Sequence, residues 1–123
     1  MGLSFELTDE QEAIRQTTRE FADQVVVPRA AEFDRESRFP YPLVEKMGEL
    51  GLFGLPYPES VGGAGGDFIS YLLALEEISR ADAALGITLE AAVSLGAAPI
   101  FNFGTEEQKA RLLPLAAPRD TAG

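Results

Sequence analysis

The chain has 123 residues, a length typical of one domain, and 46% of them are hydrophobic, which is enough for a core. Ten Lys plus Arg against twenty Asp plus Glu give a formal net charge of −10, which disfavours nucleic-acid and anionic membrane-surface partners. The sequence contains no Cys and no His, and this excludes disulfides, thiol catalysis and Cys/His metal sites.

The N-terminal segment carries no sign of a targeting peptide. Residues 1–8 have neither a basic region followed by a long apolar run nor an Arg-rich, acid-poor composition. Arg outnumbers Lys and Ala is abundant, a composition typical of GC-rich bacterial genomes. We therefore expect a bacterial, cytoplasmic protein.

The first helix is expected to begin at Thr8, because Thr8 and Gln11 form a capping-box pattern. Its apolar positions follow the helical period: Ala13, Ile14, Phe21, Ala22, Val25 and Val26. Pro28 either ends this helix near Val26 or kinks it. The apolar pattern stays in phase as far as Phe33, which favours the kink.

A second, short helix is expected after Pro42, a residue suited to a first helical turn, and it ends at Gly51. Residues 53–58 contain two prolines and are predicted to be extended. The Gly-rich loop 59–66 has two interpretations, a phosphate cradle or a tight turn with positive φ angles. The turn is favoured because the loop lacks a phosphate-binding spacing and is flanked by Glu59 and Asp67.

The third helix is expected to be capped by Asp67. Its apolar face comprises Phe68, Tyr71, Leu72, Leu75 and Ile78. Glu76, Glu77 and Arg80 are predicted to form a surface charge cluster, in which Glu76 and Arg80 are four residues apart in the order that favours an ion pair. The adjacent Glu76 and Glu77 point about 100° apart on a helix, so they do not form a catalytic carboxylate dyad.

Asp82 is expected to cap a fourth, almost uniformly apolar helix that reaches about Ala98 and is buried on several sides. The whole apolar stretch from Ala83 to Phe103 contains Glu90 and Pro99, so it is interpreted as a buried helix rather than a membrane span. Glu90 either lines a ligand cavity or faces outward or toward another subunit. Within the helix, Ile87, Ala91 and Leu95 share one face, which the pattern alone assigns to the core.

A last helix is predicted after Gly104, with Thr105 and Gln108 as a second capping box and Pro114 opposing continuation. Residues 116–123 show no pattern and are expected to fray. No alternating strand pattern stands out. The fold class is therefore all-α, an up-and-down-like bundle of four to five helices in one domain spanning 1–123.

Several motifs occur together in a recognisable order. They are Leu7-Thr8-x-x-Gln11, Pro28 with Ala31-Glu32-Phe33-Asp34, Met47-Gly-Glu-Leu-Gly51, Pro58-Glu59 with Gly62-Gly63, Glu76-Glu77-Ile78-Ser79-Arg80, Ser94-Leu95, Pro99-Ile100, and Phe103 to Pro114. The ordered set, over roughly residues 5–114, resembles the N-terminal helical domain of acyl-CoA dehydrogenases.

The resemblance implies that this domain belongs to a larger acyl-CoA dehydrogenase that acts on short- or medium-chain acyl groups. In this family FAD accepts a β hydride from an acyl-CoA thioester after a glutamate removes the α proton, and an electron-transferring flavoprotein takes the electrons. The glutamate and most flavin contacts belong to regions this sequence lacks, so we expect no catalytic residue here and no activity of the isolated chain. The intact protein is expected to be a homo-oligomer, a dimer or tetramer.

By the same resemblance, the wall of the acyl tunnel comprises Ile87, Thr88, Ala91 and Leu95. Two alternatives remain open at this point. One is that the domain belongs to a related flavin oxidase or monooxygenase, and the other is that it is a stand-alone helical interaction module.

Overall fold

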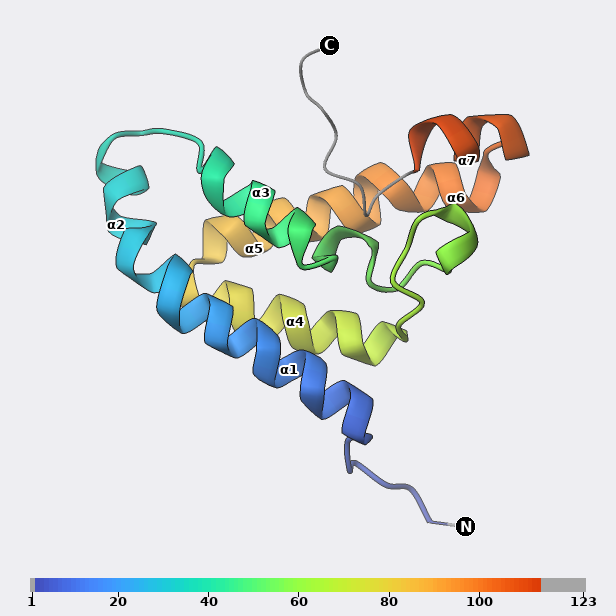
Figure 1. Cartoon of the computed structure of the whole chain (residues 1–123), viewed down its shortest axis with the longest axis horizontal. Helices are drawn as coiled ribbons and strands as arrows, with labels where there is room; N and C mark the ends of the chain where they lie inside the picture. The colour runs from blue at the N-terminus through green and yellow to red at the C-terminus, as the bar shows by residue number, and fades with distance from the viewer. Residues whose placement is uncertain (1, 114–123) are drawn as a thin grey trace.

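The computed structural model describes residues 2–113, and every regular element within them is helical (Figure 1). The elements are α1 (Asp9–Phe21), η1 (Ala22–Val26), α2 (Val27–Arg35), α3 (Tyr41–Glu49), η2 (Leu52–Gly54), η3 (Glu59–Val61), α4 (Phe68–Ala81), α5 (Ala83–Glu90), η4 (Ala91–Ala97), α6 (Ala98–Phe103) and α7 (Glu106–Leu112). Because η1 joins α1 to α2 and η4 joins α5 to α6 without a break, the longer elements form five rods. The predicted all-α class is confirmed.

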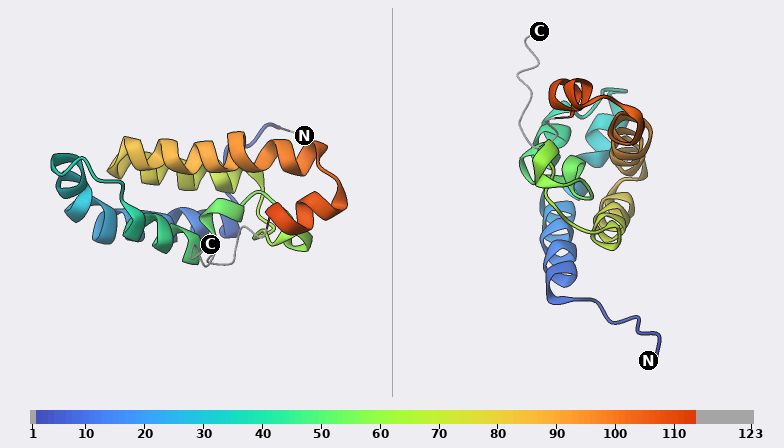
Figure 2. Two further views of the ribbon diagram at one scale, coloured as in Figure 1. Left: turned by 90° about the horizontal axis from the view of Figure 1, so that it is seen from above. Right: turned by 90° about the vertical axis from the view of Figure 1, so that its right-hand side faces the viewer.

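Helix α4 lies at the centre of the arrangement. It packs against α1 on one side and against α5 on the other, and the two views of Figure 2 show these helices side by side. The largest fully buried side chains of the core are Tyr71, Leu43, Met47, Ile78, Leu85 and Leu89. The N-terminal arm leads away from the bundle, with Phe5 largely exposed (Figure 1).

The four helix starts predicted from capping residues are confirmed, and α3 begins at Tyr41, one residue before Pro42. The capping boxes of α1 and α7 both form, with the Gln11 and Gln108 amides each 3.1 Å from the hydroxyls of Thr8 and Thr105. The side chains of Asp67 and Asp82 accept from the first turns of α4 and α5. These caps occupy backbone donors that a helix start otherwise leaves without partners, which is why the sequence locates them well.

Both internal prolines are accommodated by π-helical turns rather than by helix ends. The first rod continues through Pro28, as predicted, with η1 directly before α2. The long apolar helix also continues through Pro99 to Phe103, so the predicted end near Ala98 is wrong. A proline ring clashes with the carbonyl four residues earlier, and a wider π turn moves that carbonyl away.

The segment between α3 and α4 is more tightly wound than expected. Residues 52–54 form a 3-10 turn that follows Gly51 at φ 76°, so the prediction of an extended segment is wrong at this end. The glycine-rich loop is a turn, with Gly62 at φ 82° and Gly65 at φ 72°. These left-handed conformations favour glycine, which confirms the turn interpretation.

The predicted pair between Glu76 and Arg80 is wrong. Arg80 instead lies 3.1 Å from a Glu77 carboxylate oxygen and 2.6 Å from one of Asp23. Glu77 is buried and Asp23 belongs to η1, so Arg80 joins the first rod to α4. The predicted fraying of 116–123 and the stop at Pro114 concern residues outside those that the structure describes.

Candidate functional site: an exposed apolar helix face

The outer face of the long helix formed by α5, η4 and α6 is the candidate site. Its inner face is buried at a four-residue spacing by Leu85, Leu89, Val93 and Ala97. On the opposite side Ile87 is 68% exposed and Leu95 is 71% exposed. The assignment of this second stripe to the core is therefore wrong.

The long helix as a whole is poorly covered within the described part of the chain. Ala83–Phe103 spans 21 residues, and 28% of its most apolar window is buried, so burial on several sides is not observed. By length and composition alone, this helix could cross a membrane. An apolar surface of this kind on a helical bundle marks a contact surface for another molecule or another part of the protein.

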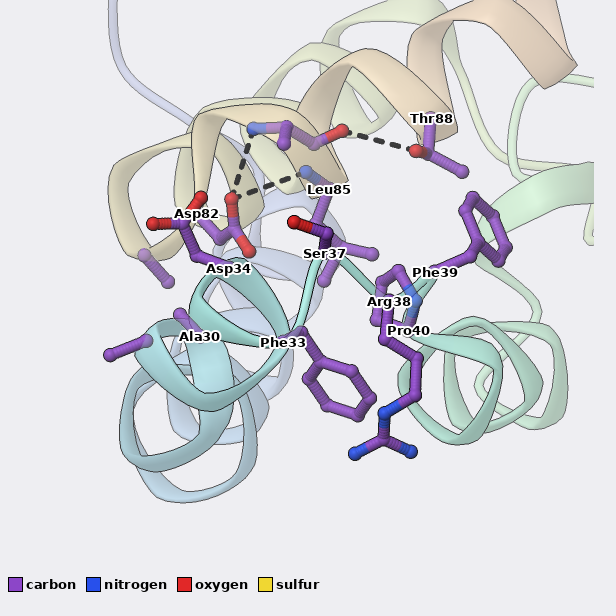
Figure 3. A pocket seen from close by; sticks show the side chains of 13 residues that line it. Ala30, Phe33, Asp34, Ser37, Arg38, Phe39, Pro40, Asp82, Leu85 and Thr88 are labelled. Atoms are coloured by element: carbon purple, nitrogen blue, oxygen red, sulfur yellow. Dashed lines mark hydrogen bonds between the residues drawn. The ribbon is translucent and has the colours of Figure 1, made fainter.

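Thr88 and Ala91, the other two predicted wall residues, are half-buried. The Thr88 hydroxyl donates to the Ala84 carbonyl at 3.0 Å, so it bonds back to its own helix. Thr88 also lines a cavity of about 620 Å³ between α5 and the segment that joins α2 to α3 (Figure 3). The four residues therefore lie on adjoining strips rather than on one.

The cavity has an apolar base and a polar edge. Phe33 and Leu85 are both buried in its lining, and the Arg38 guanidinium lies 4.7 Å from the centre of the Phe33 ring. Asp82 lines the edge, but its carboxylate accepts from the α5 backbone, as the dashed lines in Figure 3 show. Arg38 is paired with Glu36 and Glu32. The charged groups named here serve structural contacts, and none forms a nucleophile–base pair.

Two buried tyrosines, Tyr57 and Tyr71, lie beneath the long helix; the sequence placed Tyr71 on an apolar helix face and suggested no functional role for either. Burial raises the pKa of Tyr57, and neighbouring Tyr71 raises it further. Burial likewise raises the pKa of Tyr71, against a lowering by Ser94, and half-buried Glu90 raises it further. Glu90 is half-buried and lies close enough to Tyr71 of α4 to affect its pKa, so its carboxylate does not face fully outward.

The glycine-rich loop offers no site for a phosphate. The amides of residues 62–66 all donate to backbone carbonyls of residues 54–59, at 2.8 to 3.0 Å. A side chain at Gly63 or Gly66 would collide with the backbone oxygens of Tyr57 or Leu55. With its donors used internally and acidic residues on either side, the loop does not fit the pyrophosphate of a dinucleotide such as FAD.

The chain matches the model of the acyl-CoA dehydrogenase N-terminal domain over residues 8–119. A short-chain-specific acyl-CoA dehydrogenase from Clostridium acetobutylicum is 50% identical over 115 residues, which are 93% of this chain and 30% of that protein. Butyryl-CoA dehydrogenase from Megasphaera elsdenii superposes with a TM-score of 0.87 at 38% identity, over 94% of this chain and 31% of that one.

A chain from the structure of electron transferring flavoprotein of Acidaminococcus fermentans superposes with a TM-score of 0.88 at 46% identity. The match covers 93% of this chain and 30% of that one. The present chain thus spans less than a third of the length of these relatives.

Proposed function

Because this chain belongs to the acyl-CoA dehydrogenase family and corresponds to the N-terminal domain of its members, we propose that it is part of a flavoprotein that oxidises acyl-CoA thioesters between the α and β carbons. The observation that carries this proposal is the exposed apolar face of the long helix. A fold that superposes so well on much longer enzymes, yet leaves an apolar helix face uncovered, is built to pack against further parts of such an enzyme.

The four residues Ile87, Thr88, Ala91 and Leu95 are proposed to form one wall of the acyl tunnel. Their exposed surface is apolar, apart from a threonine hydroxyl that is already bonded to its own helix. Burying each methylene of an acyl chain against such a wall contributes roughly 0.8 kcal/mol. The wall therefore binds the chain and excludes water, and the chemistry belongs to other groups.

We assign the cofactor contacts to parts of the enzyme outside this domain. FAD, as the proposed cofactor, supplies the hydride acceptor when bound, but the described loop does not fit its pyrophosphate. The net charge of −10 equally disfavours contact with the nucleotide end of CoA. We further propose a short- or medium-chain thioester as substrate, an electron-transferring flavoprotein as acceptor, a homo-oligomer, and a bacterial cytoplasmic location.

A hybrid enzyme tests the proposal. Residues 8–113 of this chain would replace the matching segment of the Clostridium acetobutylicum relative, and turnover of butyryl-CoA would be followed with an artificial electron acceptor. We expect an active hybrid, an inactive 123-residue chain and an active unmodified relative. A folded, flavin-containing hybrid without activity would contradict the proposal, as would turnover by the 123-residue chain alone.

A further inference from the structure

The π-helical segment η4 sets the register of the proposed wall. It carries Ala91 and Leu95, whereas Ile87 and Thr88 precede it in α5. A π turn contains one residue more than an α turn, and each α-helical residue rotates the helix by about 100°. Loss of the π turn would therefore change the orientation of Leu95 relative to Ile87.

One side chain from a distant part of the sequence reaches into this segment. The Tyr57 hydroxyl donates to the Val93 carbonyl at 2.6 Å, and this contact is buried. The same carbonyl accepts the Ala98 amide five residues on, which is the π-helical bond itself. A carbonyl oxygen has two lone pairs, so Val93 can accept both bonds. The Tyr57 ring also packs edge-on against Phe101, with centroids 5.2 Å apart.

The main chain of Tyr57 is held in place by the glycine-rich loop. Its amide donates to Gly54 at 3.1 Å and its carbonyl accepts from Gly65 at 2.8 Å. A Cβ atom on Gly63 would lie 2.1 Å from the Tyr57 carbonyl oxygen, so glycine alone allows this approach. The loop therefore holds the tyrosine against the helix.

We propose that Tyr57 is a positioning residue, which keeps η4 in its π register and thereby fixes the orientation of Ala91 and Leu95 on the acyl wall. This inference rests on the proposed function. It gives the glycine-rich loop a role that its sequence did not suggest, since the loop acts on the substrate wall through Tyr57 rather than on a phosphate. Because the wall contacts the acyl chain, its register affects the preference for chain length.

The first test compares Tyr57→Phe with Tyr41→Phe in the hybrid enzyme. Tyr41 is largely exposed, so its variant removes a hydroxyl that does not touch the wall. We expect Tyr57→Phe to change the ratio of kcat/KM for butyryl-CoA to that for octanoyl-CoA by about fivefold, the effect of one net hydrogen bond, and Tyr41→Phe to leave it unchanged. A third variant, Ile78→Val, removes a methylene group from the core on α4. It should lower the free energy of unfolding without changing the ratio of the two kcat/KM values.

The second test needs no activity and uses the 123-residue chain. Amide hydrogen exchange should be about fivefold faster for residues 94–98 in Tyr57→Phe, with exchange in α1 unchanged. An unchanged ratio in an active hybrid, or unchanged exchange in this segment, would overturn the inference. An inactive hybrid whose η4 amides still respond to Tyr57→Phe would instead contradict the proposed function while leaving the structural role of Tyr57 supported.

Discussion

Helix α4 and the long helix that follows it show that the more apolar of two helices is not necessarily the more buried one. Helix α4 carries charged residues, yet Tyr71, Ala74 and Ile78 are fully buried because α1 and α5 cover it from two sides. The long helix is more apolar, yet 28% of its most apolar window is buried, because no described element covers the side opposite α4. Burial is therefore set by the neighbours of a helix, and the apolarity of its sequence alone does not predict it.

Two leucines of the long helix, one on each face, should show the largest difference in stability between a buried and an exposed position. Leu89 is fully buried and Leu95 is 71% exposed, so they offer the same truncation in two environments. Leu89→Ala should lower the free energy of unfolding by about 2 to 5 kcal/mol, and Leu95→Ala by less than about 0.5 kcal/mol. Urea denaturation of the 123-residue chain measures both. Similar losses for the two variants would mean that the outer face is buried in solution.

Two glycines in the long helix give a second contrast. A Cβ at Gly86 would lie 2.1 Å from the Ser79 hydroxyl oxygen, whereas at Gly96 the closest atom is 3.6 Å away. Gly86→Ala should therefore destabilise by about 1 to 3 kcal/mol through separation of α4 from α5. Gly96→Ala should be neutral or stabilising by up to about 1 kcal/mol, since alanine favours helix.

Thermal unfolding of the two glycine variants measures the contrast. A tolerated Gly86→Ala would show that α4 and α5 pack less closely than the structure has them.

The sequence predicted features that depend on residues close together in the chain, and it missed features that depend on how the helices pack. The four helix caps could be predicted because each cap contacts a backbone within three residues. Asp23 as a partner of Arg80 could not be predicted, since it is 57 residues away and meets Arg80 only once η1 packs against α4. The π turns also escaped prediction, because a proline in a helical pattern is compatible with an end, a kink or a widened turn.

The candidate site was located only in part from sequence. An almost uniformly apolar helix shows no preferred face, so its pattern could not decide between Leu89 and Leu95 as core residues. The resemblance to the family implied that Leu95 and Ile87 are wall residues, which remains a prediction, while the pattern alone assigned them to the core. The proposed role of Tyr57 required knowing that its side chain packs against η4.

The pH dependence of the α4 start is the smallest expected effect. Asp67 accepts hydrogen bonds from the Ser70 amide at 2.7 Å and from Gln11 at 2.8 Å. The bonds from Ser70, followed by that from Gln11, hold the pKa of the exposed Asp67 below its usual value of 3.8. Because the folded pKa is the lower one, this stabilisation is complete above the unfolded pKa and is lost as the pH falls through the folded value.

Asp67→Asn provides the matched control, since asparagine also caps helices but does not titrate. Between about pH 5 and pH 2, the original chain should lose more stability than the asparagine variant, as measured by urea denaturation at each pH. Parallel pH profiles for the two chains would show that Asp67 has no depressed pKa in the folded state.

A single thiol on the outer face reports whether this surface is covered in an enzyme. The chain has no cysteine, so Leu95→Cys introduces a unique probe in the free chain, and the same substitution can be made in a hybrid without other reactive thiols. Thiol labelling should proceed at least about tenfold more slowly in the hybrid than in the 123-residue chain, because the probe becomes buried against the rest of the enzyme. Equal labelling rates in the two proteins would contradict the assignment of this face to the acyl tunnel and its domain contacts.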